Sequence, residues 1–283
     1  MGNVCGNRTF TLVPIGGLGN RLRAICSCIV FCTEHDMKLE IIWFRDHGLN
    51  CPFDELFDLS PILHNVTIRN PRLIDYFVSD NPRRRNFWIP KFFQKFHYDR
   101  QIYMPELLSY KSNKDLVKQD FSKFKSIFMV SCGIYWENLN MWKYIVVNPS
   151  ILEKVNSILG RLGDNFIGVH VRRTDSVESI TYSPTPLFKE FLDKELKKDP
   201  SVRFYLASDS LEEKKYFKDI YRDNLQTSLE NVDRNSIEGI CNAFVELLVL
   251  SKSKKMYAGH SSFADLASYI GDVERVLVSI NNK

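Results

Sequence analysis

The sequence contains no run of about 18 uninterrupted apolar residues, so it predicts no helix that spans a membrane. It also shows no charged N-terminal region followed by an apolar run, so no signal peptide is expected. The net charge is only +4, which argues against nucleic acid as a partner. Repeats, low-complexity tracts and Gly/Ser linkers are absent, and 44% of the 283 residues are hydrophobic. This composition excludes a disordered, collagen-like or coiled-coil protein and predicts a substantial core.

The seven cysteines have neither the spacing of a disulfide framework nor that of a metal site. Cys26, Cys28 and Cys32 fall in one helix-like run without a CxxC motif or a nearby pair of histidines. We therefore expect small buried hydrophobic side chains in a reducing compartment, with a cytoplasmic location.

Strand-like and helix-like runs alternate along the chain, which predicts an α/β fold with parallel sheets. In the first half we expect a helix at residues 21–34 and strands at 9–15, 38–44, 66–68 and 126–134. The second half repeats β and α units with about five strands, including 166–171, 202–207, 255–258 and 275–280; its helices are expected at 150–162, 186–198, 212–222, 236–251 and 262–270. Pro149 disfavours helix at Asn148, and a new helix begins just after it. The predicted domains are therefore 1–148 and 149–283.

Three predicted strands of the second half end in polar residues. These ends are the segments 170–175, 208–210 and 259–263. Because the carboxyl ends of parallel strands share one edge of a sheet, we expect these segments to converge there.

Each segment suits an anionic ligand. Arg172 can form a bidentate contact with a phosphate, and a helix that begins near Ser261 and Ser262 offers free N–H groups with a positive dipole end. Asp209 can accept a hydrogen bond from a ribose hydroxyl or a purine N–H. Together they describe a site for a nucleotide diphosphate. No DxD or paired-carboxylate motif accompanies them, so no metal is expected.

Simpler explanations exist for each segment. A lone His170 in an apolar strand is most often a hydrogen-bonded core residue, and the Arg172-Asp175 turn is compatible with a solvated ion pair. The serines at 208–210 and 261–262 are typical N-caps. These alternatives stay open, and the expected convergence at one sheet edge favours the binding site.

Gly16-Gly17-Leu18-Gly19-Asn20 follows the first strand and opens the first helix. It is not a Walker loop, because no Gly-Lys-Ser/Thr follows, and it matches the dinucleotide fingerprint only in part. The glycines predict a tight turn that allows close approach of a ligand or, alternatively, of another backbone segment.

In order and spacing, these motifs resemble those of the α1,2-/α1,6-/protein O-fucosyltransferase superfamily. The resemblance rests on Gly16 to Arg21, His170-Val-Arg172-Arg173-Thr-Asp175, Ala207-Ser208-Asp209 and Ser261-Ser262-Phe263. It implies a GT-B-like fold of two Rossmann-like domains facing a cleft. It also implies metal-independent, inverting transfer of fucose from GDP-fucose to a glycan or lipid-linked glycan acceptor, without a cofactor. The donor would bind mainly to 149–283, and 1–148 would be the acceptor side.

The resemblance also implies roles for single residues. Arg172 would bind the β-phosphate, His170 would line the donor site, Asp209 would lie near the nucleoside, and Ser261, Ser262 and Phe263 would form the turn around the pyrophosphate. Gly17, Gly19, Asn20 and Arg21 would belong to the loop that faces donor and acceptor. Asp175 and Glu178 are candidate catalytic bases, unless the departing phosphate takes the proton.

This sequence departs from the family pattern in two places. Asn20-Arg21 stands where other members have Gly-Asn-Gln or similar, and Ala264-Asp265-Leu266 replaces an aromatic run. Linkage and acceptor are therefore open. The alternatives are a GT-B transferase with another nucleotide sugar and a catalytically idle nucleotide- or glycan-binding protein.

Residues 81–100 combine six basic residues and one acidic residue with six aromatic ones. One interpretation is peripheral contact with a membrane or with a lipid-linked acceptor. The other is an insertion whose aromatic side chains pack inward while its basic residues remain solvated.

Overall fold

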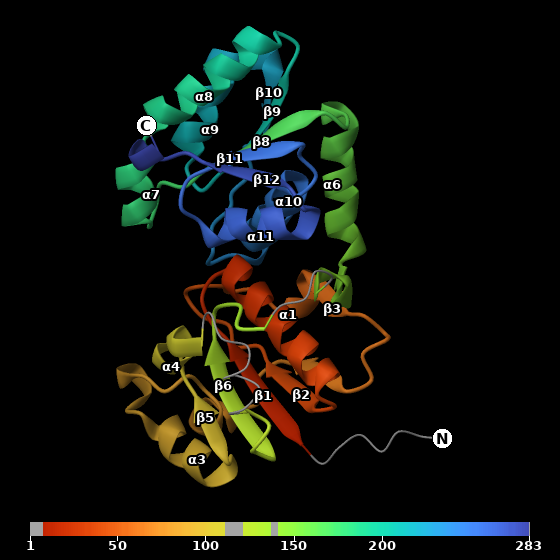
Figure 1. Cartoon of the computed structure of the whole chain (residues 1–283), viewed down its shortest axis with the longest axis vertical. Helices are drawn as coiled ribbons and strands as arrows, with labels where there is room; N and C mark the ends of the chain where they lie inside the picture. Colours follow the sequence, from red (N-terminus) through yellow and green to blue (C-terminus); the bar gives the residue numbers. More distant parts are fainter. Residues whose placement is uncertain (1–7, 111–120, 137–140, 283) are drawn as a thin grey trace. The chain divides into compact units, whose positions relative to one another are not determined.

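The computed structural model describes residues 8–110, 121–136 and 141–282. The chain divides into two compact units, one ending at Val147 and the other beginning at Asn148. Each unit contains a five-stranded sheet whose strand pairs are all parallel (Figure 1). The predicted α/β fold with parallel sheets is confirmed.

The sheet of unit 1 has the order β4-β2-β1-β6-β5. Its strands are β1 (Thr9–Pro14), β2 (Lys38–Ile42), β4 (Val66–Arg69), β5 (Arg100–Ile102) and β6 (Ser126–Ser131), and β3 (Phe57–Leu59) pairs separately with β7 (Ile145–Val147). The helices are α1 (Leu18–Glu34), η1 (Phe53–Glu55), α2 (Asp75–Val78), η2 (Arg84–Asn86), α3 (Ile89–His97), α4 (Met104–Tyr110) and η3 (Met141–Tyr144). The strand predicted at 126–134 ends at Ser131, because the chain turns away from β1 there.

Helix α1 is buried along most of its length, which explains its apolar composition. Cys26, Cys28 and Cys32 lie in it as free, buried thiols, and burial raises the pKa of Cys26 to about 12. The prediction that these cysteines act as small hydrophobic side chains is confirmed. A protonated thiol of this kind is chemically inert.

The sheet of unit 2 has the order β10-β9-β8-β11-β12. Its strands are β8 (Phe166–Val171), β9 (Arg203–Ser208), β10 (Leu225–Thr227), β11 (Lys255–Ala258) and β12 (Glu274–Leu277). The helices are α6 (Pro149–Leu162), α7 (Val177–Tyr182), α8 (Thr185–Lys198), α9 (Leu211–Tyr221), η4 (Arg222–Asn224), α10 (Ile237–Leu250), α11 (Ser262–Gly271) and η5 (Ile280–Asn282).

Helices cover both faces of this sheet (Figure 1). On one face, Leu187 and Phe188 of α8 and Phe217 of α9 pack against Val169 and Leu206 of the central strands. On the other face, α6 and α10 contact each other and β9, and α11 packs beside α10. This burial of both faces accounts for the almost wholly apolar strands.

The strand order fixes where the sheet can bind a ligand. From β8 the chain moves outward to β9 and β10, and it then returns to the other side of β8 to form β11 and β12. The order therefore reverses between β8 and β11. In open parallel sheets, ligands bind at such a reversal, outside the carboxyl ends of the strands.

Candidate functional site

The segments after β8 and β11 meet at the reversal point. His170, near the end of β8, pairs in register with Ala258 at the end of β11. The His170 ring stacks on Phe263 in the first turn of α11, with centroids 5.0 Å apart and planes 21° apart. Two of the three predicted site segments are thus in direct contact.

His170 is buried, with 6% of its surface exposed. Burial lowers its pKa to about 3, and the positive charges of Arg172, Arg275 and Arg173 act in the same direction, against an opposing effect of Asp209. Its Nδ1 atom has no hydrogen-bond partner among the described residues. His170 is therefore neutral at physiological pH and can position a ligand, whereas it cannot act there as an imidazolium acid.

Arg172 lies in a cluster of two arginines and one carboxylate. Its Nε donates to Oδ1 of Asp175 over 2.8 Å, and Nη1 of Arg234 donates to the other carboxylate oxygen over 2.7 Å. Burial works to raise the pKa of Asp175, but the two guanidinium groups outweigh it and hold that pKa below its usual value. The local ion pair considered from the sequence exists, and a second cation, Arg234, joins it.

Asp209, at the end of β9, holds the turn that carries Arg172. One carboxylate oxygen accepts from the backbone N–H of Arg173 at 2.7 Å, and the other accepts from the Thr174 hydroxyl at 2.7 Å. The third predicted segment is thus also tied to the first. Ser210, one residue later, is the N-cap of α9.

Arg173 is a structural member of the same turn. Its guanidinium donates to the Ser183 carbonyl at 3.0 Å, to the Thr185 hydroxyl at 3.0 Å and to Glu213 at 3.1 Å. Only 14% of its side chain is exposed. Of the two adjacent arginines, Arg173 therefore anchors the turn to α8 and α9, while Arg172 lies at the reversal point.

The segment that opens α11 is the other half of the site. The Ser261 hydroxyl accepts from the Phe263 N–H at 3.2 Å, so Ser261 is the N-cap that the simpler explanation expected. Ser262 is the first residue of the helix and is half-buried. The N–H groups of this first turn, together with the helix dipole, provide a positive end beside His170.

Arg275 of β12 also belongs to this rim, although the sequence analysis assigned it no role. Its Nη2 donates to the Gly259 carbonyl at 2.5 Å, and the guanidinium also pairs with Asp265. Burial lowers its pKa. The one feature of the sequence that could have pointed to a role for Arg275 is its position in a four-residue strand, where only apolar residues follow it.

Helix α7 packs against Gly259. A Cβ atom on Gly259 would lie 2.8 Å from the Ser183 hydroxyl and 2.9 Å from the Ser179 hydroxyl, so this position has room only for glycine. Glu178, in the first turn of α7, has its Oε1 3.5 Å from Nδ1 of His260. Glu178 was a candidate from the sequence, whereas His260, which the fold brings next to it, was not.

The glycine-rich loop of unit 1 is organised by Arg21. The Arg21 side chain is fully buried, donates from Nε to the Gly16 carbonyl at 2.8 Å, and pairs with Asp46 at 2.8 Å. Gly16 has φ +84°, a conformation that requires glycine. Arg21 therefore holds the loop, in which Gly17 and Asn20 are half-buried and Gly19 is buried.

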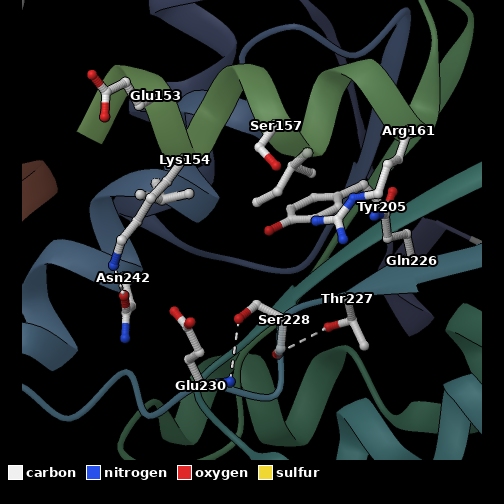
Figure 2. Close-up of a pocket in the computed structure, with 12 residues that line it drawn as sticks. Glu153, Lys154, Ser157, Arg161, Tyr205, Gln226, Thr227, Ser228, Glu230 and Asn242 are labelled. Atoms are coloured by element: carbon white, nitrogen blue, oxygen red, sulfur yellow. Dashed lines mark hydrogen bonds between the residues drawn. The ribbon is translucent and has the colours of Figure 1, made fainter. Parts of the chain in front are cut away.

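Unit 2 also has a pocket of about 400 Å3 between α6, α10 and the β10 edge of the sheet (Figure 2). Lys154 donates to Asn242 at 3.3 Å at one end, and Arg161 lies at the other. Tyr205 of β9 lines it with a buried hydroxyl that has no partner in the described parts of the chain. None of the motif residues lines this pocket, so it is separate from the rim at the reversal point.

The described residues contain no group of three or more His, Cys, Asp or Glu side chains placed to hold a metal ion. No helix in residues 8–110, 121–136 and 141–282 has the length and apolar character needed to cross a membrane.

No sequence family and no curated protein matches the chain significantly. Solved structures, in contrast, do match the chain. The α-1,6-fucosyltransferase NodZ soaked with GDP-fucose has a TM-score of 0.66 at 16% identity, covering 97% of this chain and 96% of NodZ. POFUT1 in complex with GDP-fucose has a TM-score of 0.59 at 10% identity, covering 97% and 99%. A mutant of Arabidopsis thaliana FUT1 in complex with GDP has a TM-score of 0.60 at 13% identity, covering 95% and 69%.

These similarities extend over nearly the whole chain, so they concern both units. The chain has the GT-B-like fold of these fucosyltransferases, as the motifs in the sequence predicted.

Proposed function

We propose that the chain is a glycosyltransferase that moves fucose from GDP-fucose to a sugar hydroxyl of a glycan acceptor, with inversion and without a metal ion. The observation that carries this proposal is the contact between the His170-Arg172 segment and the start of α11 at the strand-order reversal. It is supported by the fold, which is that of structures solved with GDP-fucose or GDP.

In this proposal the diphosphate of the donor lies between Arg172 and the N-terminus of α11. Arg172 exchanges Asp175 for the β-phosphate, and Arg234 keeps Asp175 paired. As the C1–O bond of fucose breaks, negative charge grows on the departing diphosphate. A guanidinium and a helix N-terminus stabilise that charge more in the transition state than in the ground state, which lowers the barrier.

The neighbours of the two candidate bases distinguish them. Asp175 is held by two arginines that lower its pKa, which makes its carboxylate a poor proton acceptor. Glu178 is 62% exposed and lies beside His260, so we assign it the role of base, with proton transfer to the departing phosphate as the alternative. His170, neutral and stacked on Phe263, would position the donor.

Further parts of the proposal concern the rest of the chain. We assign residues 149–283 to the donor and 1–148 to the acceptor, with Gly17, Gly19 and Asn20 in the loop that approaches the donor. Arg21 shapes that loop through its hydrogen bond to the Gly16 carbonyl, and we assign it no contact with the ligand. The free cysteines agree with a cytoplasmic enzyme of glycan biosynthesis.

Titration calorimetry with GDP, UDP and ADP tests the donor. We expect GDP to bind most tightly and Arg172→Ala to weaken it at least ten-fold, because a charge-assisted contact to the phosphate is lost. Arg203→Ala is the matched control, since Arg203 lies at the opposite end of β9. Tight binding of UDP without GDP would favour another nucleotide sugar.

Mass spectrometry of products from GDP-fucose and a panel of acceptor sugars tests the reaction. A fucosylated product that disappears with Arg172→Ala is expected. GDP binding without a product for any acceptor in the panel would favour the idle binding protein.

A further inference from the structure

Helix α3 and the turn before it present apolar side chains to solvent. Phe87 is 83% exposed, Trp88 54%, Phe92 62% and Phe96 72%. Together with Ile89 and Phe93 they form what we call the α3 patch. For these residues the interpretation that the aromatic side chains pack inward is wrong.

The α3 patch follows the periodicity of a helix face. Its helical members are at positions 89, 92, 93 and 96, and the Phe92 and Phe96 rings touch, with centroids 4.9 Å apart. The buried residues of α3 are Pro90 and Gln94, on a different side of the helix. The apolar face is therefore not the face that attaches the helix to unit 1.

A buried polar network fixes the base of the patch. Asp80, 5% exposed, accepts from the Arg83 guanidinium at 3.0 Å and from the Asn86 amide at 3.1 Å. Gln94 donates to the Asp80 carbonyl at 2.8 Å and accepts from the Tyr103 hydroxyl at 2.7 Å. The network makes the turn and the helix one rigid element.

The turn itself has an unfavourable backbone. Phe87 and Trp88 both have left-handed conformations, with φ of 52° and 61°. Such residues cost on the order of 1 kcal/mol or more each and persist where the surrounding structure imposes them. Here the imposed conformation exposes two aromatic rings to solvent. The stability of the fold gives no reason for this exposure, because neither ring is packed in the core.

Four exposed basic residues lie in the same segment. Arg84 and Arg85 precede Phe87, whereas Lys91 and Lys95 lie on other sides of α3 than the apolar face. Arg84, Arg85, Lys91 and Lys95 are exposed, and none of them forms an ion pair with any residue in the described parts of the chain. The Arg83 and Arg100 side chains are instead neutralised by Asp80 and Glu106. The segment thus combines an apolar helix face with exposed cations that precede it in the chain or lie on other sides of the helix.

We propose that the α3 patch docks unit 1 on an anionic phospholipid bilayer, with the aromatic rings at the level of the headgroups and with Arg84 and Arg85, in the turn before them, attracted to the lipid phosphates. Aromatic and apolar residues on one helix face with Lys and Arg beside them are the composition of helices that lie in a membrane interface. A second copy of the chain fits less well, because a two-fold contact through the patch would bring like-charged side chains of both copies into one interface.

Co-sedimentation of the full chain with vesicles tests the proposal. We compare vesicles of 30% phosphatidylserine in phosphatidylcholine with vesicles of phosphatidylcholine alone. Binding is expected only to the anionic vesicles and should fall in 0.5 M NaCl. Trp88 should report insertion by a blue shift of its fluorescence that Trp88→Phe abolishes.

Two double variants separate the apolar and ionic contributions. Phe92→Ser with Phe96→Ser should weaken binding at least ten-fold. Arg84→Gln with Arg85→Gln should weaken it about 25-fold, since each cation near an anionic surface contributes about five-fold. All four side chains are exposed, so unchanged circular dichroism is expected.

Matched controls lie elsewhere on the surface. Ile62, 62% exposed in the same unit, is replaced by Ser, and the exposed Lys252 and Lys254 by Gln; neither change should affect binding. Absence of binding to anionic vesicles, or equal losses in variants and controls, would overturn the proposal. So would a dimer in sedimentation velocity that the Phe92/Phe96 variant dissociates, since the patch would then join two copies.

Discussion

Replacing His170 with Phe should change how the stability of the protein depends on pH. The imidazole is buried, its pKa is about 3, and a histidine in the unfolded chain ionises near 6.5. Between these values the unfolded chain binds a proton that the native protein excludes. Stability is therefore lost as the pH falls below about 6.5, and the loss levels off near pH 3.

The size of the effect follows from the difference between the two pKa values. At pH 5 the proton taken up by the unfolded histidine costs the native state about 2 kcal/mol, from 1.5 pH units at 1.36 kcal/mol each. Phe keeps an aromatic ring against Phe263 and has no proton to bind. His170→Phe should therefore lose about 2 kcal/mol less than the wild type between pH 8 and pH 5.

Urea denaturation of both proteins at the two pH values measures this difference. Glu246 acts in the opposite sense, because burial raises its pKa to about 7 and its protonation stabilises the native state as the pH falls. That contribution is present in both proteins and cancels when they are compared. His64→Asn, which removes an exposed imidazole, is the control substitution.

A direct readout is the NMR titration of the histidine ring carbons. We expect the His170 signal not to shift between pH 8 and pH 5. A midpoint above about 5.5, or a difference in pH dependence of less than 0.5 kcal/mol, would refute a neutral, buried imidazole. The role of His170 in positioning the donor would then need to be replaced by one in proton transfer.

Three further substitutions test single packing statements by thermal unfolding. Tyr205→Phe removes a buried hydroxyl without a partner and should stabilise by about 1 kcal/mol, or about 2–4 °C; a lower melting temperature would mean that the hydroxyl is bonded. Gly259→Ala should cost about 1–3 kcal/mol, because its Cβ would clash with Ser183, and a neutral result would contradict the tight packing of α7. Gly160→Ala, in an exposed helical position with nothing within 4 Å, should instead stabilise by about 1 kcal/mol, and destabilisation there would argue against the α6 assignment.

Long apolar runs made most of the fold predictable. The strands at β8 and β9 and the helix at α10 were recognisable because burial on both faces of a parallel sheet demands continuous hydrophobic residues. Elements β5 and β10 were missed, since three residues are too few to show a period. Short helices such as α7 are held by their packing, which no local pattern records.

The convergence of the site segments was predictable, but the partners of single residues were not. Parallel topology alone places the ends of β8, β9 and β11 at one edge. Arg275 and His260 reach the rim through contacts with Gly259 and Glu178, respectively, which lie far from them in the sequence, and sequence spacing carries no such information. Arg21 is the converse case, since the sequence placed it in the loop expected to face donor and acceptor, and the structure buries its side chain completely.

The pairing of Arg172 with Asp175 explains how the proposed donor site can remain stable without a ligand. Without Asp175, Arg172 and the start of α11 would place positive charge at the edge of the sheet, which opposes folding. Asp175 offsets part of it at the cost of competing with a phosphate for Arg172, and Arg234 reduces that competition by binding the other carboxylate oxygen. A diphosphate, which carries more negative charge than one carboxylate, can therefore displace Asp175 without leaving it unpaired. In the proposed reaction, Asp175 is also in place to bind Arg172 again once GDP dissociates.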